Sequence, residues 1–583
     1  MYILGLATMG ESAAALIKDG VLVAAAEEER FTRFKHEGCF PLRAIDYCLK
    51  EEGLAISDIE HVGVYWQPWK IRKRAQEVIS TLWRRPRSFA QKFSRALKEF
   101  SPVGGGEKTS SDGSWIELFQ IKQILIRNFG PFKGRIHYFD HHTCHIASSF
   151  LASPFEEATI LSLDGGGEEL STTMAVGSGQ KIKLLKKVYW PHSLGHFYSA
   201  ITGFLGFKME DGEYKMMGLA PYNTPDYLDI IRKEILITND PGSFQINTRI
   251  IDYHDALANH FSKDAIKIFG RPRLSDKDPF NERHQKIASS AQAAFEEVVM
   301  DLALWAYKAG GGKKNICISG GCGLNCTANG NLLRNGPFEK MYIPPAPHDA
   351  GGSIGAALLV YHEILEKPRK FIMEHAHYGP SFSDEEVQKV LVDRKIYTQP
   401  ILEEKQLLEK TVEYLASGKI IAWFQDEMEF GPRALGNRSF LADPRNDSIR
   451  DVINEKIKKR ELFRPFAPSV KEECASDYFE INQSSPFMNI TAPVHKAKMD
   501  EIPAVTHIDG SARIQTVSKE HNMRYWKLLD TFHKKTNVPV LLNTSFNIQE
   551  PIVCTPEDAI ETFRNSNVDA LVIQNYFISR AML

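Results

Sequence analysis

Short apolar runs bounded by glycine turns alternate with amphipathic stretches along most of the chain. Residues 2–6 and 20–26 are apolar, and we predict that they pair as strands around residues 13–18, with a turn at Asp19-Gly20. Residues 41–52 carry the periodicity of an amphipathic helix. This alternation of strands and helices predicts an α/β fold.

Three later turns combine glycine with polar side chains. The apolar run 158–163 leads into Asp164 and three glycines, the run 315–319 leads into Gly320-Gly321, and the turn 349–352 opens a helix. Glycine lets backbone N–H groups approach an anion, and an aspartate at such a turn can hold a cation. A single glycine cluster is more often a tight turn than a ligand site, but three of them favour a nucleotide cleft between two α/β lobes.

Two histidines four residues apart suggest a metal site. If residues 141–151 are helical, His141 and His145 lie on one face, while His142 points about 100° away. Histidines at this spacing are more often capping or core residues. Two imidazoles together with Asp164 and Asp349 nevertheless suit a catalytic divalent metal better than a closed structural zinc.

The length and composition limit the class of protein. A chain of 583 residues exceeds one ordinary core, so two or more domains are expected, with a boundary where the pattern loosens around residues 367–383. The net charge of −2 provides no overall attraction to nucleic acid or acidic lipid. Eight cysteines without a C-x-x-C pair indicate reduced thiols. With no cationic leader and no long apolar segment, we expect a cytoplasmic enzyme without a membrane span.

One segment is strongly basic. Residues 70–98 hold ten lysines and arginines and only one acid, Glu77, interleaved with Trp83, Phe89 and Phe93. One interpretation is a solvated helical arm that packs on a neighbouring subunit or domain. The other is a lid or docking surface for an anionic or lipidic acceptor.

The C-terminal third contains four segments in which cations accompany short polar side chains at strand ends. They are residues 429–439, 458–468, 509–515 and 541–547. Together they predict a pocket for a phosphorylated small molecule, in which arginine makes forked contacts and lysine supplies a point charge. The alternative is that Arg433, Arg438 and Arg464 are structural ion-pair residues. Proline restricts the backbone beside Arg433 and Arg464, which disfavours the structural alternative for these two arginines.

At this point a family resemblance becomes specific. The chain resembles the NodU/CmcH family of O-carbamoyltransferases through motifs spread over nearly its whole length: residues 26–33, 193–198, 211–222, 429–439 and 464–469. The most specific is Glu-Phe-Gly-Pro-Arg-Ala-Leu-Gly-Asn-Arg-Ser at 429–439. The resemblance implies an actin-like ATPase domain of the Kae type, with two lobes, over residues 1–375. It also implies a YrdC-like α/β domain over residues 376–583.

The resemblance implies two reactions. In the YrdC-like domain, carbamoyl phosphate and ATP, with Mg²⁺, would give carbamoyl-adenylate and pyrophosphate. In the Kae-type domain, the carbamoyl group would pass to a hydroxyl of a small-molecule acceptor, such as a sugar, natural product or antibiotic intermediate, releasing AMP. The family metal is thought to be Fe²⁺, although the ligand set alone also admits manganese or zinc.

Carried over position by position, the resemblance implies three sets of site residues. The metal ligands would be His141, His145, Asp164 and Asp349. The activation pocket would use Arg433, Lys458, Arg464, Arg513, Asn543 and Ser545, with Lys459 an alternative to Lys458. The nucleotide site of the Kae-type domain would use Gly166, Gly167, Gly320, Gly321 and Asn325.

The chain departs from the family pattern in its first turn. Where relatives usually carry a His-Asp pair, this sequence has Gly10 and Glu11. Any proton-transfer role of that histidine is therefore lost, or is supplied by another group such as Glu11 or His196.

Other functions remain as alternatives. Kae-type and YrdC-like domains also serve tRNA threonylcarbamoyladenosine synthesis, but the near-neutral charge and the absence of a broad basic face disfavour nucleic acid as a partner. Hydrogenase-maturation carbamoyltransferases carry C-x-x-C zinc fingers, which this chain does not have. A non-catalytic nucleotide-binding scaffold is the alternative from another class. The acceptor is not readable from the sequence, and a homodimer is the default expectation for a soluble enzyme.

Overall fold

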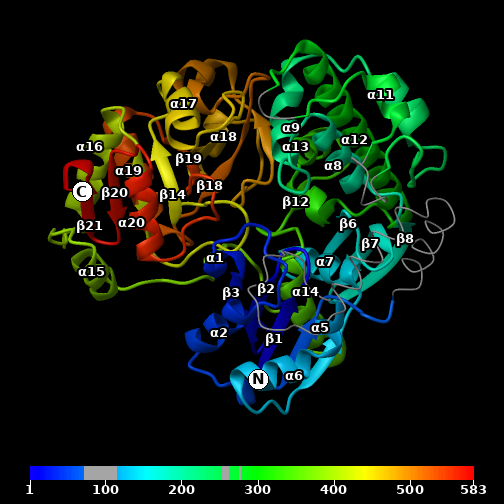
Figure 1. The fold of residues 1–583 in the computed structure, drawn as a ribbon, viewed down its shortest axis with the longest axis horizontal. Helices are drawn as coiled ribbons and strands as arrows, with labels where there is room; N and C mark the ends of the chain where they lie inside the picture. Colours follow the sequence, from blue (N-terminus) through cyan, green and yellow to red (C-terminus); the bar gives the residue numbers. More distant parts are fainter. Residues whose placement is uncertain (71–114, 253–260, 275–277, 583) are drawn as a thin grey trace. The chain divides into compact units, whose positions relative to one another are not determined.

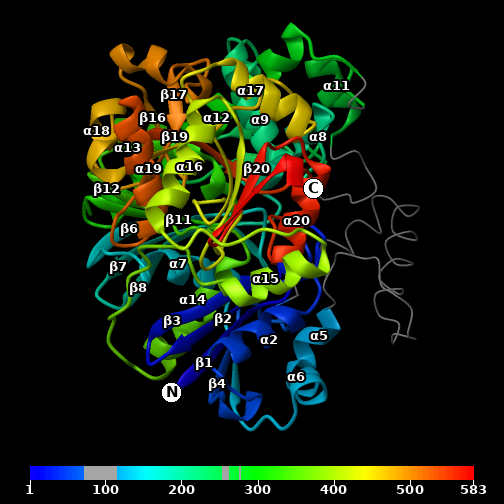
Figure 2. The same cartoon turned by 90° about the vertical axis from the view of Figure 1, so that its left-hand side faces the viewer.

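The computed structural model describes residues 1–70, 115–252, 261–274 and 278–582 (Figures 1 and 2). The chain forms two compact units. Unit 1 comprises residues 1–23 and 36–372, and unit 2 comprises residues 24–35 and 373–583. Residues 71–98, which make up nearly all of the basic segment, lie outside the described residues. Among the described helices, none combines the length and the apolar character that crossing a bilayer requires.

The first sheet has the strand order β3-β2-β1-β4-β5, and all of it except the end of β3 lies in unit 1. Its strands are β1 (Tyr2–Ala7), β2 (Ala13–Lys18), β3 (Val21–Glu27), β4 (His61–Val64) and β5 (Arg135–Tyr138). Strand β1 is antiparallel to β2 and parallel to β4. The predicted pairing of residues 2–6 with 20–26 is therefore wrong. Residues 13–17 are apolar and fully buried, so they form the strand that lies between the other two.

The second sheet of unit 1 repeats this topology. Its order is β12-β11-β6-β7-β8, in which β6 is antiparallel to β7 and parallel to β11. The strands are β6 (Glu157–Leu163), β7 (Leu170–Ser178), β8 (Lys181–Tyr189), β11 (Asn315–Ser319) and β12 (Lys340–Tyr342). The α/β fold class is confirmed, and the duplicated sheet is what a two-lobed domain requires.

Two central helices of unit 1 approach each other unusually closely. They are α7 (His141–Phe150) and α14 (Gly351–Leu359), and α14 also packs on β1 (Figure 1). A Cβ on Gly355 would collide with the carbonyl oxygen of Cys144 in α7. A Cβ on Gly5 in β1 would collide with the carbonyl oxygen of Ser353 in α14. Only glycine allows these backbones to come so close.

The remaining helices of unit 1 surround the two sheets. The longest described helix, α12 (Glu282–Ala309), packs against β6 and against several helices, among them α8 (Leu194–Phe204), α9 (Glu213–Leu219) and α13 (Cys326–Asn335). The others are α2 (Leu42–Glu51), α5 (Trp115–Phe119), α6 (Ile121–Phe129), α10 (Leu228–Ile230) and α11 (Lys263–Phe269), and β9 (Leu236–Ile237) pairs with β10 (Gln245–Ile246).

Unit 2 is built on a seven-stranded mixed sheet of order β18-β15-β19-β14-β13-β20-β21. The strands are β13 (Ile421–Phe424), β14 (Arg438–Ala442), β15 (Ala467–Lys471), β18 (Gln515–Val517), β19 (Val540–Ser545), β20 (Ala570–Ile573) and β21 (Tyr576–Ser579). A separate pair consists of β16 (Thr491–Pro493) and β17 (Ser511–Arg513). Its helices are α15 (Asp384–Asp393), α16 (Glu404–Ala416), α17 (Ser448–Val452), α18 (Ala475–Tyr478), α19 (Met523–Thr536) and α20 (Pro556–Asn565).

The early segment 24–35 belongs to unit 2. It contains α1 (Glu29–Thr32). Arg30 donates to the carbonyl oxygen of Gly431 at 2.8 Å, and Arg33 donates to that of Ile552 at 2.7 Å. The first family motif therefore packs directly on the Glu429–Ser439 motif, although some 400 residues separate the two in sequence.

The contact between α7 and α14 can be tested with Gly355→Ala. Because the added methyl group would overlap a backbone carbonyl, we expect a loss of about 1–3 kcal/mol in the free energy of unfolding. Urea unfolding of the full chain measures it, with the volume-conserving Leu359→Met in the same helix as the control. Equal midpoints for Gly355→Ala and the unaltered protein would contradict this account of the packing.

Candidate functional site

Helix α7 presents two histidines to one point inside unit 1. Asp140 caps the helix by accepting a hydrogen bond from the backbone N–H of Thr143 at 3.4 Å. His141 and His145 are fully buried, and their Nε2 atoms lie 2.9 Å apart. His142 faces elsewhere and lies 3.1 Å from Ser162 through its Nδ1. The predicted helix, with His141 and His145 on one face, is confirmed.

Two aspartates from other elements complete this cluster. Asp164 follows β6, and its Oδ2 lies 3.3 Å from the Nε2 of His141. Asp349 precedes α14, and its Oδ1 lies 3.5 Å from the Nε2 of both histidines. The four ligand atoms all lie within 4.8 Å of one another. The structure therefore brings together all four residues predicted as metal ligands.

The distances within this cluster fit a single ion. Two ligands bound at about 2.1 Å lie about 3.0 Å apart at a right angle and about 3.4 Å apart at the tetrahedral angle. The shortest separations here run from 2.9 Å between His141 and His145 to 3.5 Å between His145 and Asp349. Two imidazole nitrogens and two carboxylate oxygens suit iron, manganese or zinc.

The charges also favour a cation at this point. Burial alone would lower the pKa of His141, but Asp349 and Asp164 raise it to about 9. Burial alone would raise the pKa of Asp164, but the neighbouring histidines hold it well below its ordinary value. The carboxylates therefore stabilise positive charge inside a buried site.

The glycines predicted to hold nucleotide phosphate have partners within the chain. The amides of Gly166 and Gly321 donate to the carboxylate of Asp164, at 3.1 and 2.9 Å. Those of Gly167 and Gly320 donate to the carbonyl oxygens of Leu170 and Pro347. Asn325 caps α13 and exchanges hydrogen bonds with Gln292. In this structure the glycine turns orient the aspartate, and a role toward phosphate stays a prediction.

Three residues that the sequence did not single out support the histidines. The rings of Tyr65 and Trp66 lie 5.1 and 5.0 Å from that of His141. Glu168 accepts hydrogen bonds from the backbone N–H groups of Gln67 and His141. Its position directly after the Asp164 glycine turn could have indicated that Glu168 lies beside the cluster. Nothing in the sequence marked Tyr65 or Trp66.

The first turn lies against the same cluster. Gly10 has φ of 70°, and a Cβ there would collide with Oδ2 of Asp349. Tyr65 donates from its hydroxyl to the carbonyl oxygen of Met9 and, at 3.4 Å, to Oδ2 of Asp349. A larger residue at position 10 therefore requires a different loop conformation. This is a physical reason for glycine at position 10.

In unit 2, the structure distinguishes Lys458 from Lys459. Lys458 is buried, and its Nζ donates to the side chains of Ser545 at 3.2 Å and Asn547 at 2.7 Å. Burial, followed by the charges of Arg460 and Arg464, holds its pKa well below the ordinary value. Lys459 is exposed. Of the two, Lys458 is the lysine that meets Ser545.

The other predicted activation residues lie around the same sheet. Asn543, on β19 with Ser545, donates to the side chains of Ser469 and Gln515 at 3.0 and 2.9 Å. It also donates to the carbonyl oxygen of Ala434, the neighbour of Arg433. Arg464 lies 3.5 Å from Glu461, and Arg513 ends β17. The structure thus joins Lys458 to Ser545 by a direct contact, and Arg464 lies near enough to Lys458 to affect its pKa.

Arg438 and Glu429 fix the shape of the 429–439 motif. One oxygen of Glu429 accepts from the backbone N–H groups of Leu435 at 2.6 Å and Asn437 at 2.8 Å. Arg438 is fully buried, covers the ring of Phe424 at 3.6 Å, and donates to the carbonyl oxygens of Gln425, Asp426, Asn437 and Pro380. Arg438 is therefore a structural residue, as the alternative interpretation predicted. Backbone carbonyl groups hold it where that interpretation expected an ion pair.

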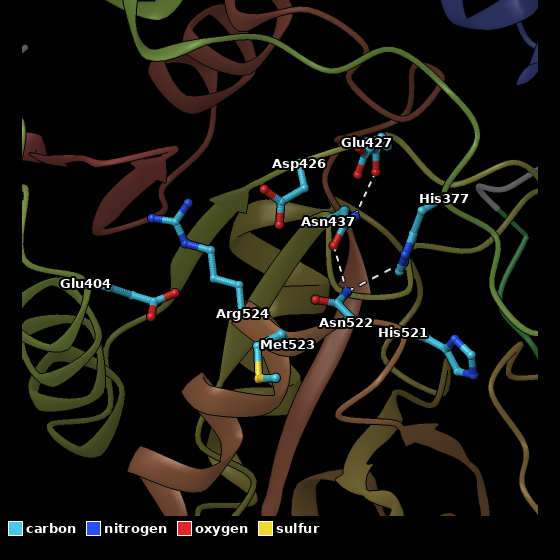
Figure 3. A pocket seen from close by; sticks show the side chains of 9 residues that line it. All are labelled: His377, Glu404, Asp426, Glu427, Asn437, His521, Asn522, Met523 and Arg524. Atoms are coloured by element: carbon cyan, nitrogen blue, oxygen red, sulfur yellow. Dashed lines mark hydrogen bonds between the residues drawn. The ribbon is translucent and has the colours of Figure 1, made fainter. Parts of the chain in front are cut away.

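Unit 2 also contains a pocket of about 310 Å³ beside this motif (Figure 3). Asn437 and Asn522 meet in its wall, with Nδ2 of Asn522 2.8 Å from Oδ1 of Asn437. None of the six predicted activation residues lines it. The lining residues are His377, Glu404, Asp426, Glu427, Asn437, His521, Asn522, Met523 and Arg524.

Comparison with known proteins agrees with the motifs. The family model described as carbamoyltransferase N-terminus matches residues 2–358, and that described as carbamoyltransferase C-terminus matches residues 412–580. The nodulation protein NolNO of Sinorhizobium fredii is 37% identical over 98% of this chain and 79% of its own length. The nodulation protein NolO of Bradyrhizobium diazoefficiens is 38% identical over 76% of this chain and 79% of its own length.

A solved structure of HypF from T. kodakarensis is 14% identical over 62% of this chain and 47% of that chain, with a TM-score of 0.31.

The fold and the buried cluster define an α/β protein with a candidate centre for a divalent metal. Both family models match this chain and together cover most of it. The chain belongs to the carbamoyltransferase family, as its motifs predicted, and is a carbamoyltransferase.

The metal assignment can be tested with His141→Ala. Removing one of four converging ligands should lower the bound metal per chain by more than about tenfold. Elemental analysis of the purified protein measures it, with His137→Ala on the neighbouring strand as the control. Full metal occupancy in His141→Ala would show that the ligand assignment is wrong.

Proposed function

We propose that this carbamoyltransferase is ATP-dependent and acts on a hydroxyl group in two steps. In unit 2, carbamoyl phosphate, water and ATP give carbamoyl-adenylate, with release of phosphate and pyrophosphate. In unit 1, the carbamoyl group passes to a hydroxyl of a small-molecule acceptor and AMP leaves. The observation that carries the proposal is the presence, in one family member, of a buried metal-type cluster in unit 1 and a buried lysine among arginines in unit 2.

The first step builds negative charge that unit 2 is equipped to stabilise. Water hydrolyses carbamoyl phosphate to carbamate and phosphate. An oxygen of the carbamate then attacks the α-phosphorus of ATP and expels pyrophosphate. Arg433, Arg464 and Arg513 supply forked donors to phosphate oxygens. Lys458 is held in place by Ser545 and Asn547 before any substrate arrives, which is the preorganisation that electrostatic stabilisation requires.

The second step takes place at the cluster of unit 1. His141, His145, Asp164 and Asp349 would hold the divalent metal, with Fe²⁺ as the family precedent. When bound, that ion supplies a positive charge that polarises the carbamoyl carbonyl or orients the adenylate phosphate. The chain itself fixes Asp164 through two glycine amides and holds His141 against Tyr65 and Trp66.

A small-molecule acceptor is favoured over tRNA. Two curated relatives that cover most of this chain are named nodulation proteins, and both carbamoyltransferase models match. The net charge of −2 provides no overall attraction to a polyanion.

The activation step is tested by pyrophosphate release from the purified protein with ATP and Mg²⁺, with and without carbamoyl phosphate. We expect release to require carbamoyl phosphate, and Arg433→Ala to slow it by about 10²- to 10³-fold, because a preorganised donor to developing charge is lost. Arg445→Ala, which removes an arginine paired with Asp443, is the matched control and should leave the rate unchanged. Release that is independent of carbamoyl phosphate would contradict the proposal.

A further inference from the structure

A carboxylate in the first turn of unit 1 is held between two imidazoles. Oε1 of Glu11 lies 2.9 Å from Nδ1 of His36, and Oε2 lies 3.0 Å from Nδ1 of His348. The other ring nitrogen of His36 lies 3.2 Å from Oδ1 of Asp211. Asp211, His36, Glu11 and His348 thus form one connected chain from four separate segments of unit 1.

This chain of residues borders the metal-type cluster. Glu11 directly follows Gly10, whose backbone packs against Oδ2 of Asp349. His348 directly precedes Asp349. The side chains of Glu11 and Asp349 are 28% and 23% exposed, whereas those of the two clustered histidines are 0% exposed. Solvent therefore reaches both Glu11 and Asp349, while the two clustered histidines are closed to it.

Glu11 is suited to accept a hydrogen bond. Burial alone would raise the pKa of its carboxyl, but His348 and His36 hold it well below the ordinary value, so the group stays ionised. An ionised carboxylate offers about four lone-pair directions and donates none. One imidazole lies against each oxygen, and the remaining lone-pair directions of the carboxylate can accept from a substrate hydroxyl.

The other carboxylates around the cluster already have partners within the protein. Asp164 accepts from the amides of Gly166 and Gly321. Glu168 is 1% exposed and accepts from the backbone N–H groups of Gln67 and His141. Asp349 faces both clustered histidines. Glu11 is a partly exposed carboxylate beside the cluster that is not itself a candidate metal ligand.

We propose that Glu11 is a catalytic residue that receives the hydrogen bond of the attacking hydroxyl, and that His36 and Asp211 are positioning residues that hold its carboxylate. This inference rests on the proposed function. The acceptor oxygen forms a bond to the carbamoyl carbon, and the bond from that carbon to the phosphate oxygen breaks, with its electron pair leaving on AMP. The hydroxyl proton passes to Glu11 and then to solvent. A carboxylate handles the nucleophile's hydroxyl proton in the same way in protein kinases.

The test uses the full-length, metal-loaded protein with carbamoyl phosphate, ATP and Mg²⁺, and with water or excess glycerol as the hydroxyl probe. In Glu11→Gln, which keeps the size but loses the charge, we expect AMP release to fall by about 10²- to 10³-fold. Pyrophosphate release and metal content should stay unchanged, because Glu11 belongs to neither site. Glu11→Asp should recover part of the AMP release, and Glu60→Gln, an exposed glutamate, is the matched control.

A second pair of variants separates positioning from folding. His36→Gln should lower the maximal rate of AMP release by about tenfold while metal content and the unfolding midpoint remain unchanged. His196→Gln, which alters a histidine beside Gly165, should have a smaller effect than Glu11→Gln.

Distinct outcomes would overturn the proposal. Unchanged AMP release in Glu11→Gln would remove the catalytic role, and so would a loss of AMP release that is accompanied by loss of metal, because that would indicate a structural role. Greater loss in His196→Gln would assign the hydroxyl to that histidine. If the unaltered protein releases no pyrophosphate with carbamoyl phosphate, the proposed function fails first, and the inference falls with it.

Discussion

The close approach of α14 to α7 and β1 is the constraint on which the site of unit 1 depends. Gly355 lets α14 touch the backbone of α7, and Gly5 lets it touch the backbone of β1, since a Cβ at either position would overlap a carbonyl oxygen. This packing holds Asp349, at the start of α14, against the histidines of α7. Dense packing of this kind leaves no room for small adjustments, so the cluster geometry is set before any ion binds.

The two units stabilise buried ionisable groups in different ways. In unit 1, carboxylates surround buried imidazoles, and glycine amides fix Asp164, so the site is ready for a cation. In unit 2, buried basic side chains are held by neutral oxygens: Lys458 by Ser545 and Asn547, and Arg438 by four backbone carbonyl groups. Arg438 therefore shapes the motif loop.

Local periodicity and motif spacing predicted much of this arrangement. The four-residue spacing of His141 and His145 predicted the helix face, and the glycine turns marked Asp164 and Asp349 as companions. The order in which the strands pair was harder to predict. Because β2 is Ala-rich and buried on both faces, no alternation of apolar and polar residues marked it as the strand between β1 and β3. The Glu11–His36–Asp211 chain joins positions up to 200 residues apart, and the place of residues 24–35 in unit 2 depends on contacts with residues near 431 and 552. No local pattern encodes such contacts.

The central claim is that one divalent ion binds to His141, His145, Asp164 and Asp349. A crystal structure of the purified protein, with anomalous diffraction measured at the absorption edge of the bound metal, tests it most directly. The account predicts one strong anomalous peak about 2.0–2.2 Å from both Nε2 atoms and from an oxygen of each aspartate. An anomalous peak elsewhere in a metal-replete crystal, with these four side chains bonded only to one another, would contradict it.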